Sequence, residues 1–289
     1  MKSYLKLIRV EQYIKNLFVF APLFFGSHFL ISKDFYMVSL AFFCFCLGAS
    51  SIYILNDYYD INEDKNHPEK CKRPLASGKI SIINGMILMS VLGILSLIIS
   101  FYISIKLFTV ILIYLALNFF YSKWLKHIAI LDINIIAVGF LLRLIAGTVV
   151  TTIIPSIWIL LMTYLLALFL GISKRRTDVL YSKSGKDVRK NIEGYNLIFI
   201  DVVMGIIAAV LIVCYIFYCI SPEIQKNYDS NWLYVSILFV FNGILRYLKL
   251  TFVDQSTYSP TKVVLHDRFL QIIILCWILL MSYLLYFKN

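Results

Sequence analysis

The chain has 289 residues, of which 61% are hydrophobic and 15% are charged, and its formal net charge is +11. A water-soluble domain of this length carries more polar surface, so the composition excludes a soluble globular protein and indicates an integral membrane protein. Basic residues collect in the cytoplasmic loops of membrane proteins, which accounts for the positive charge, and we expect no nucleic acid among the partners. The apolar runs are long and continuous, so we expect an all-α fold.

Long apolar runs follow one another along the whole chain. A helix needs about 20 apolar residues to cross a bilayer, and by that measure the sequence predicts about nine membrane-spanning helices. No room remains for a large soluble domain, so we expect a single transmembrane domain over residues 1–289. The predicted spans are 17–32, 35–55, 82–103, 107–122, 131–150, 155–173, 197–220, 231–250 and 268–287.

The charges predict how these helices are oriented. With the N-terminus placed in the cytoplasm, 22 of the lysines and arginines lie on the cytoplasmic side and 4 on the outer side. Such asymmetry is typical of multi-pass proteins of the cell (inner) membrane, so we expect the N-terminus and the long polar loops to be cytoplasmic. Arg143 lies within a predicted span, where a charge usually faces a partner. Two roles remain open for Arg143: a structural ion pair with another helix, or the binding of a phosphate.

The segment after the second span is strongly acidic and reads NDYYDINED at residues 56–64. Spacings of three and four place Asp57, Asp60 and Asp64 on one helical face, whereas Glu63 points elsewhere. Three carboxylates on one face repel one another unless a cation lies between them, and Mg²⁺ prefers carboxylate and amide oxygens together with substrate phosphates. We therefore predict a Mg²⁺ site whose ligands include Asn56. A solvated acidic loop is the alternative.

Basic residues dominate the other polar segments. Lys72 and Arg73 follow the acidic cluster and can bind phosphate directly. After the sixth span the chain reads GISKRRTDVLYSKSGKDVRKNIEGYN, in which Lys174, Arg175 and Arg176 form a run of three basic residues. One polar loop thus suits a metal ion and the other suits an anion. Ordinary positive charge on the cytoplasmic side is the alternative interpretation of the second loop.

The pattern N-D-x-x-D-x-x-x-D after the second span, followed by KRPLASGKIS, resembles the first aspartate-rich motif of the UbiA superfamily of intramembrane prenyltransferases. That resemblance implies a UbiA-like bundle of nine helices around a central cavity. Aromatic prenyltransferases of the superfamily carry a second motif, D-x-x-x-D, after the sixth span, which this sequence lacks. Other stretches resemble the decaprenyl-phosphate phosphoribosyltransferase branch: RVEQYIKNLFVFAPLFFG, HIAILDINIIAVGFLLRLIAG, SKRRTDVL, RKNIEGY, LRYLKL and VVLHDRFLQ.

The resemblance to that branch implies a membrane glycosyltransferase (a pentosyltransferase). Such an enzyme moves 5-phosphoribose from phosphoribosyl diphosphate to a polyprenyl phosphate, releases diphosphate and serves cell-envelope glycan synthesis. It implies Mg²⁺ as the cofactor and catalytic roles for Asp57 and Asp60. The substrate ligands that we expect are Lys15, Lys72, Arg73, Lys174, Arg175, Tyr181, Arg189 and Arg246. Two alternatives remain open, a UbiA-type enzyme that transfers a prenyl chain to an aromatic acceptor and a transporter or lipid-binding protein without chemistry.

Overall fold

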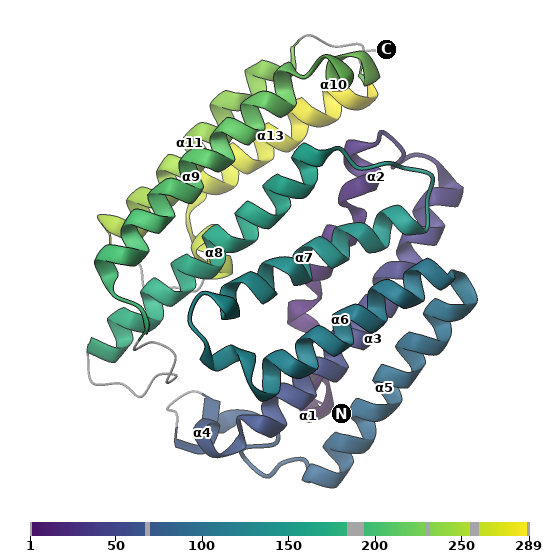
Figure 1. The fold of residues 1–289 in the computed structure, drawn as a ribbon, viewed down its shortest axis with the longest axis vertical. Helices are drawn as coiled ribbons and strands as arrows, with labels where there is room; N and C mark the ends of the chain where they lie inside the picture. The colour runs from purple at the N-terminus through teal and green to yellow at the C-terminus, as the bar shows by residue number, and fades with distance from the viewer. Residues whose placement is uncertain (1, 67–69, 184–193, 229–231, 255–259, 288–289) are drawn as a thin grey trace. The chain divides into compact units, whose positions relative to one another are not determined.

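The structure is a computed structural model that describes residues 2–66, 70–183, 194–228, 232–254 and 260–287. Within these ranges every regular element is a helix, which confirms the predicted all-α fold (Figure 1). The chain divides into two compact units, residues 1–155 and 156–289. Each unit is described by itself below, and a single domain over the whole chain stays a prediction.

Unit 1 is built around four long helices, which lie side by side in Figure 1. They are α3 (Ser32–Tyr59), α5 (Ile82–Ile103), α6 (Ile105–Lys123) and α7 (Leu131–Val149). The shorter elements are α1 (Lys2–Leu7), η1 (Val10–Phe20), α2 (Ala21–Phe25), α4 (Ile61–Asn66), η2 (Lys70–Lys72) and η3 (Leu125–His127). The starting points of α5 and α6 are explained by their N-terminal caps. The side chains of Ser81 and Ser104 each accept a hydrogen bond from a backbone N–H in the first turn of the helix.

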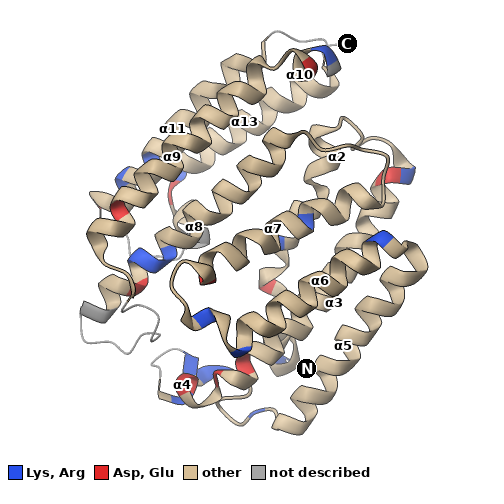
Figure 2. Ribbon diagram, in the orientation of Figure 1, with Lys and Arg blue, Asp and Glu red and all other residues tan. Residues whose placement is uncertain are grey.

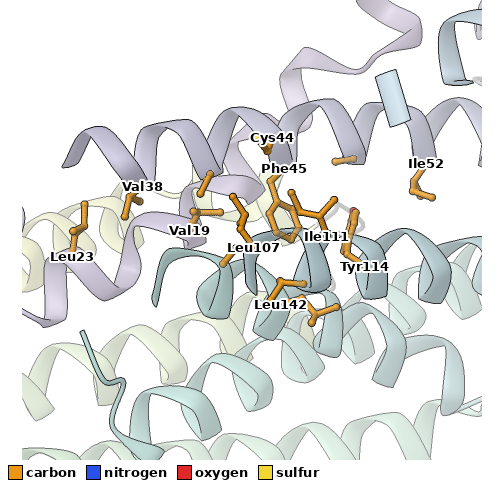
Figure 3. Packing of buried hydrophobic residues seen from close by; sticks show 14 of the residues in the cluster. Val19, Leu23, Val38, Cys44, Phe45, Ile52, Leu107, Ile111, Tyr114 and Leu142 are labelled. Atoms are coloured by element: carbon orange, nitrogen blue, oxygen red, sulfur yellow. The ribbon is translucent and has the colours of Figure 1, made fainter. Parts of the chain in front are cut away.

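The core of unit 1 lies between α3, α6 and α7. Phe45, Ile111, Tyr114 and Leu142 point into it from these three helices (Figure 3). Lipid is as apolar as these side chains, so close packing rather than water exclusion holds such helices together. The contact of α7 with η1 shows how close that packing is: a Cβ added at Gly147 would lie 2.0 Å from the backbone oxygen of Val19. Only glycine therefore allows the two backbones to meet.

The first predicted span, residues 17–32, is the one that differs from the structure. It is not one long helix, because the 3₁₀ helix η1 ends at Phe20, the short helix α2 ends at Phe25 and turns follow. Pro22 has no N–H to donate to the residue four positions earlier, which favours a change of helix type at this point. Ser27, with φ of 57°, then ends the helical path. The other eight spans each match a helix of spanning length.

Unit 2 contains four further long helices. They are α8 (Ile157–Lys183), α9 (Leu197–Ile220), α11 (Ile237–Phe252), which continues the short helix η5 (Leu233–Ser236), and α13 (Arg268–Tyr286). Two short helices, α10 (Pro222–Asn227) and α12 (Pro260–His266), connect them. Asn196 and Asp267 cap α9 and α13 by accepting hydrogen bonds of 2.7 and 2.8 Å from backbone N–H groups.

The membrane-protein prediction is confirmed by these helices. In the described part of the chain, 8 helices are long and apolar enough to cross a bilayer. The middle of α5, α9 and α13 carries no charged side chain, and acidic and basic residues gather instead around α4 and at helix ends (Figure 2). The chain is therefore a multi-pass membrane protein whose charged residues lie mainly at helix ends and in loops, with Arg143 inside α7 as an exception.

Candidate functional site

Three buried carboxylates lie where α3 meets α4. Asp57 stands in the last turn of α3, Asp60 caps that helix and Asp64 stands in α4, and their exposed fractions are 2%, 4% and 2%. The backbone stays helical across the junction, since the N–H of Asp60 bonds to Asn56 and that of Asp64 bonds to Asp60. This continuity puts the three carboxylates on one side, while Glu63 is exposed to solvent.

Basic side chains neutralise this acidic cluster. Arg73 donates to Asp57 at 3.1 Å and to Asp64 at 2.6 Å and so joins the two carboxylates. Arg9 also forms an ion pair with Asp57, and Lys126 forms one with Asp60. Burying a carboxylate is strongly unfavourable unless a charge of opposite sign accompanies it, which explains why each of the three carboxylates has a basic partner.

Arg9 reaches Asp57 through an uncommon backbone conformation. Its φ and ψ of 52° and 53° are left-handed, which an L residue with a side chain adopts only at some cost in energy. The residue starts η1, and its guanidinium also lies over the ring of Tyr53, 5.1 Å from the centroid. The left-handed turn thus brings a cation from the N-terminal segment onto the end of α3.

Asn56 supplies the observation that bears on a metal ion. Its amide nitrogen donates to Asp60 at 3.1 Å, but its amide oxygen is buried and has no hydrogen-bond partner among the described residues. A buried oxygen without a donor beside a carboxylate fits a hard cation such as Mg²⁺. In the described ranges, no three His, Cys, Asp or Glu side chains converge as a metal site. That finding is compatible with Mg²⁺, which usually takes one or two carboxylates and completes its shell with phosphates and water.

Arg9 and Lys126 were not among the ligands expected from the sequence. Lys126 is 4% exposed, although it lies in the short helix η3 between two spans. Both residues lie on the same predicted side of the membrane as the acidic cluster, which was the available signal. It was hidden by the many other lysines and arginines that the topology puts on that side.

Two of the predicted basic ligands in unit 2 form ion pairs with acidic neighbours. Arg175, which is 1% exposed, donates to Asp178 at 2.7 Å. Arg246 makes a two-pronged contact with Asp267, in which its Nη2 donates at 2.6 Å. These two predicted substrate ligands thus each already have a carboxylate partner.

Arg176 is a candidate that the sequence interpretation passed over. Its Nε donates to Asp201 at 2.7 Å, and its guanidinium lies 5.4 Å from the ring centroid of Phe252. Its Nη1 is buried and lacks an acceptor among the described residues. A buried donor without an acceptor suits an anionic ligand.

The remaining predicted ligands lie on both units. Lys15 is partly buried on η1, Lys72 is exposed on η2, Lys174 is exposed on α8 and Tyr181 is partly buried near the end of that helix. Arg189 lies outside the described residues. The structure thus brings Arg73 together with Asp57 and Asp64 and leaves Lys15 and Lys72 apart from the carboxylates.

Comparison with known proteins places the chain among relatives that it matches over nearly its whole length. A model of the UbiA prenyltransferase family matches residues 18–273. A protein of Mycolicibacterium smegmatis named decaprenyl-phosphate phosphoribosyltransferase is 34% identical, over 98% of this chain and 92% of the relative. A protein of the same name from Mycobacterium tuberculosis is 33% identical, over 94% of this chain and 91% of the relative.

The fold also matches a solved structure. A UbiA homolog from Archaeoglobus fulgidus, bound to GPP and Mg²⁺, aligns with a TM-score of 0.75 over 98% of this chain and 99% of that one. The two sequences are 18% identical, so this likeness concerns the fold.

Proposed function

Because the chain belongs to the UbiA prenyltransferase family, we propose that it transfers 5-phosphoribose from phosphoribosyl diphosphate to a polyprenyl phosphate and releases diphosphate. The observation that carries the proposal is the asymmetry of its polar residues. An acidic cluster follows the second span, whereas the run Lys174, Arg175 and Arg176 stands after the sixth, where a second aspartate-rich motif would serve a prenyl diphosphate. Relatives named for phosphoribosyl transfer match nearly the whole chain and support this choice.

The acidic cluster is assigned to the diphosphate of the donor. Asn56, Asp57, Asp60 and Asp64 would hold Mg²⁺, with the free amide oxygen of Asn56 as one ligand. Bound Mg²⁺ neutralises negative charge on a leaving diphosphate. Arg9, Arg73 and Lys126 already contact these carboxylates, so they lie close to where the diphosphate would be held.

The reaction requires little from the protein beyond binding and orienting the two substrates. An oxygen of the lipid phosphate attacks the anomeric carbon of the ribose, the bond from that carbon to the diphosphate oxygen breaks, and the electron pair leaves with the diphosphate. Such sugar transfers pass through oxocarbenium-like transition states. The attacking oxygen is already anionic, so no general base is required. Basic residues hold the phosphates, for which Lys15, Lys72, Arg73, Lys174, Arg175, Arg189 and Arg246 are the candidates, with Tyr181 as a hydrogen-bond donor.

The location of the reaction follows from the charge asymmetry. We assign the N-terminus, the acidic cluster and the basic end of α8 to the cytoplasmic face of the cell membrane. Phosphoribosyl diphosphate, a highly charged soluble donor, would reach the site from that side. The lipid acceptor would enter from the bilayer, and its product would serve cell-envelope glycan synthesis.

The direct test is an assay on membranes from cells that overexpress the chain. Polyprenyl phosphate, Mg²⁺ and radiolabelled phosphoribosyl diphosphate are added, and the label is counted in the organic phase with and without EDTA. We expect label in the lipid that EDTA abolishes. Absence of label, with activity appearing when a prenyl diphosphate and an aromatic acid are supplied, would overturn the proposal in favour of aromatic prenyl transfer.

A further inference from the structure

Arg143 is the buried cation of unit 1 that the acidic cluster does not explain. It stands in the middle of α7 and is 5% exposed. Its Nε donates to the amide oxygen of Asn16 at 2.8 Å, its Nη1 to the backbone oxygen of Gly139 at 2.8 Å and its Nη2 to the hydroxyl of Tyr114 at 3.0 Å. The side chain therefore ties α7 to both η1 and α6.

Aromatic rings complete the surroundings of this guanidinium. The ring centroids of Phe45, Tyr114 and Phe140 lie 5.5, 4.9 and 5.4 Å from its central carbon. Each face of a ring attracts a cation, but none carries a full negative charge. All partners of Arg143 among the described residues are therefore neutral, whereas Arg9, Arg73 and Lys126 each contact a carboxylate.

Lys15 is the second cation of this region without a carboxylate. It precedes Asn16 on η1, is partly buried and has no ion pair or hydrogen bond among the described residues. Burial, followed by the nearby charges of Arg143 and Arg9, lowers the pKa of Lys15 to about 8. Lys15 thus adjoins the residue that Arg143 hydrogen-bonds, on an element that packs against α7, and within the described residues neither cation has a carboxylate partner.

Such an arrangement is unfavourable unless an anion completes it. A charge within a membrane span is costly to insert, and charges that persist there usually have a functional partner. Arg143 has every N–H-bearing nitrogen engaged, so it has little freedom to turn toward a ligand. Lys15 has no such partner, and its ammonium group has three donors to offer.

We propose that Lys15 and Arg143 form an anion subsite in unit 1, in which Lys15 binds a phosphate dianion of a substrate and Arg143 is the positioning residue behind it. Arg143 fixes η1 through Asn16 and supplies a second positive charge that matches the dianion. The identity of the phosphate as that of a substrate rests on the proposed function. The subsite itself rests on the neutral surroundings of Arg143 and the lack of a counter-ion at Lys15.

Binding of two probes to the purified protein in detergent tests the subsite without turnover. Farnesyl phosphate represents the lipid phosphate, and ribose 5-phosphate represents the phosphate of the donor. We expect Lys15→Met to weaken at least one of them by about 10- to 100-fold, since a hydrogen bond to a charged group contributes about 1.5–3 kcal/mol. The control Lys106→Met removes an exposed lysine at the start of α6 and should leave both affinities unchanged.

The pH dependence of the same binding tests the role of Arg143. The charged groups that act on Lys15 are Arg143 and Arg9. The elements packed against η1 are α3, α7 and α2, and their other charged or titratable groups are Lys33, Asp34, Tyr36, Cys44, Cys46, Tyr53, Asp57, Tyr58, Tyr59 and Asp132. Wild-type affinity should fall as the pH rises through about 8, because Lys15 loses its proton. Arg143→Gln should weaken binding and move this fall to higher pH, since a neighbouring positive charge is gone. Arg143→Lys should restore the original midpoint.

The outcomes separate the two claims. Loss of farnesyl phosphate binding in Lys15→Met assigns the subsite to the lipid, and loss of ribose 5-phosphate binding assigns it to the donor. Unchanged affinity for both probes overturns the subsite, even if the radiolabel assay succeeds. Should Arg143→Gln not fold, Asn16→Ala keeps the charge and removes only the link to η1. Normal affinity and an unmoved midpoint in the folded Arg143 and Asn16 variants would show that Arg143 is merely structural.

Discussion

At the scale of single residues, the acidic cluster is a set of matched charges. Arg73 serves two carboxylates at once, and the amide of Asn56 gives its nitrogen to Asp60 while its oxygen stays unpaired. Ion pairs alone would not need that unpaired oxygen, since an apolar side chain of similar shape would avoid the unfavourable burial. The buried, unpaired amide oxygen of Asn56 therefore indicates that a ligand binds there.

Removal of one carboxylate should therefore remove the metal-dependent reaction. We expect Asp57→Asn or Asp60→Asn to lower Mg²⁺-dependent transfer by about 100-fold or more, because metal stabilisation of a leaving group contributes several kcal/mol. Asparagine has nearly the same shape, so the protein should remain folded in detergent, with a lower unfolding temperature because Arg9 or Lys126 loses its carboxylate partner. Initial rates in the radiolabel assay, together with thermal unfolding of the purified variants, measure both expectations.

The matched control is Glu63→Gln, which neutralises an exposed acidic residue next to Asp64 in α4. It should keep the wild-type rate. A variant of Asp57 or Asp60 that retains near-wild-type turnover would contradict the assignment of the metal ligands.

At the scale of helices, the ends carry the polar chemistry. The start of α13 is held by Asp267, which accepts from the N–H of Leu270 at 2.8 Å and pairs with Arg246 on α11. One carboxylate thus caps a helix and joins it to its neighbour. Polar side chains connect η1 to its neighbours in a similar way. Arg9, at the start of η1, pairs with Asp57 of α3, and Asn16 accepts a hydrogen bond from Arg143 of α7.

The contact of α13 with α11 should depend on pH. The hydrogen bonds from Arg246 lower the pKa of the Asp267 carboxyl. A lowered pKa means that the stabilisation is complete above the pKa of the unfolded chain, about 3.9, and is lost as the pH falls through the lowered value. Asp267→Asn keeps the cap and removes the charge, so it should reduce stability at pH 7 by about 0.5–1 kcal/mol. Thermal unfolding in detergent should show this difference shrinking below about pH 4.

Asp254→Asn is the comparison for that measurement. Asp254 pairs with Lys249 at 3.4 Å, and both side chains are well exposed, at 39% and 53%. Water screens such a pair, so the variant should unfold like the wild type at every pH. A pH-independent loss in Asp267→Asn would point to packing instead of charge.

At the scale of the whole molecule, charge asymmetry predicts which loops face the cytoplasm. The described helices provide 8 spans, and the N-terminal segment is broken into η1 and α2. The connection after α3 and the helix α10 after α9 are predicted on opposite faces. They offer exposed positions at Lys79 and Lys226.

Labelling of introduced cysteines tests this orientation. In a Cys71→Ser background, which removes a partly exposed native thiol, Lys226→Cys should react with a membrane-impermeant maleimide in intact cells. Lys79→Cys should react only after the cells are permeabilised. The reverse pattern would place the acidic cluster outside and would exclude a cytoplasmic donor.

Much of the fold was predictable from the sequence because lipid demands long apolar helices with satisfied backbones. Eight of the predicted spans match helices such as α5, whose bounds agree at both ends. The first span was wrong as a single helix, since hydropathy does not register a missing N–H at Pro22 or the left-handed turn at Ser27. The UbiA motif at residues 56–64 likewise pointed to the family that the comparisons show.

Residue types and spacing were enough to predict a multi-pass helical membrane protein with an acidic cluster on one helical face, whereas the UbiA family came from the resemblance of its motifs. These features depend on local periodicity and on the insertion preferences of single segments, which are written along the chain. The partners of each charge depended on the three-dimensional fold. Arg9 and Lys126 reach Asp57 and Asp60 across 48 and 66 positions of the chain, and Arg143 meets Asn16 across 127. Contacts at such separations follow from how the helices pack, which no local pattern encodes.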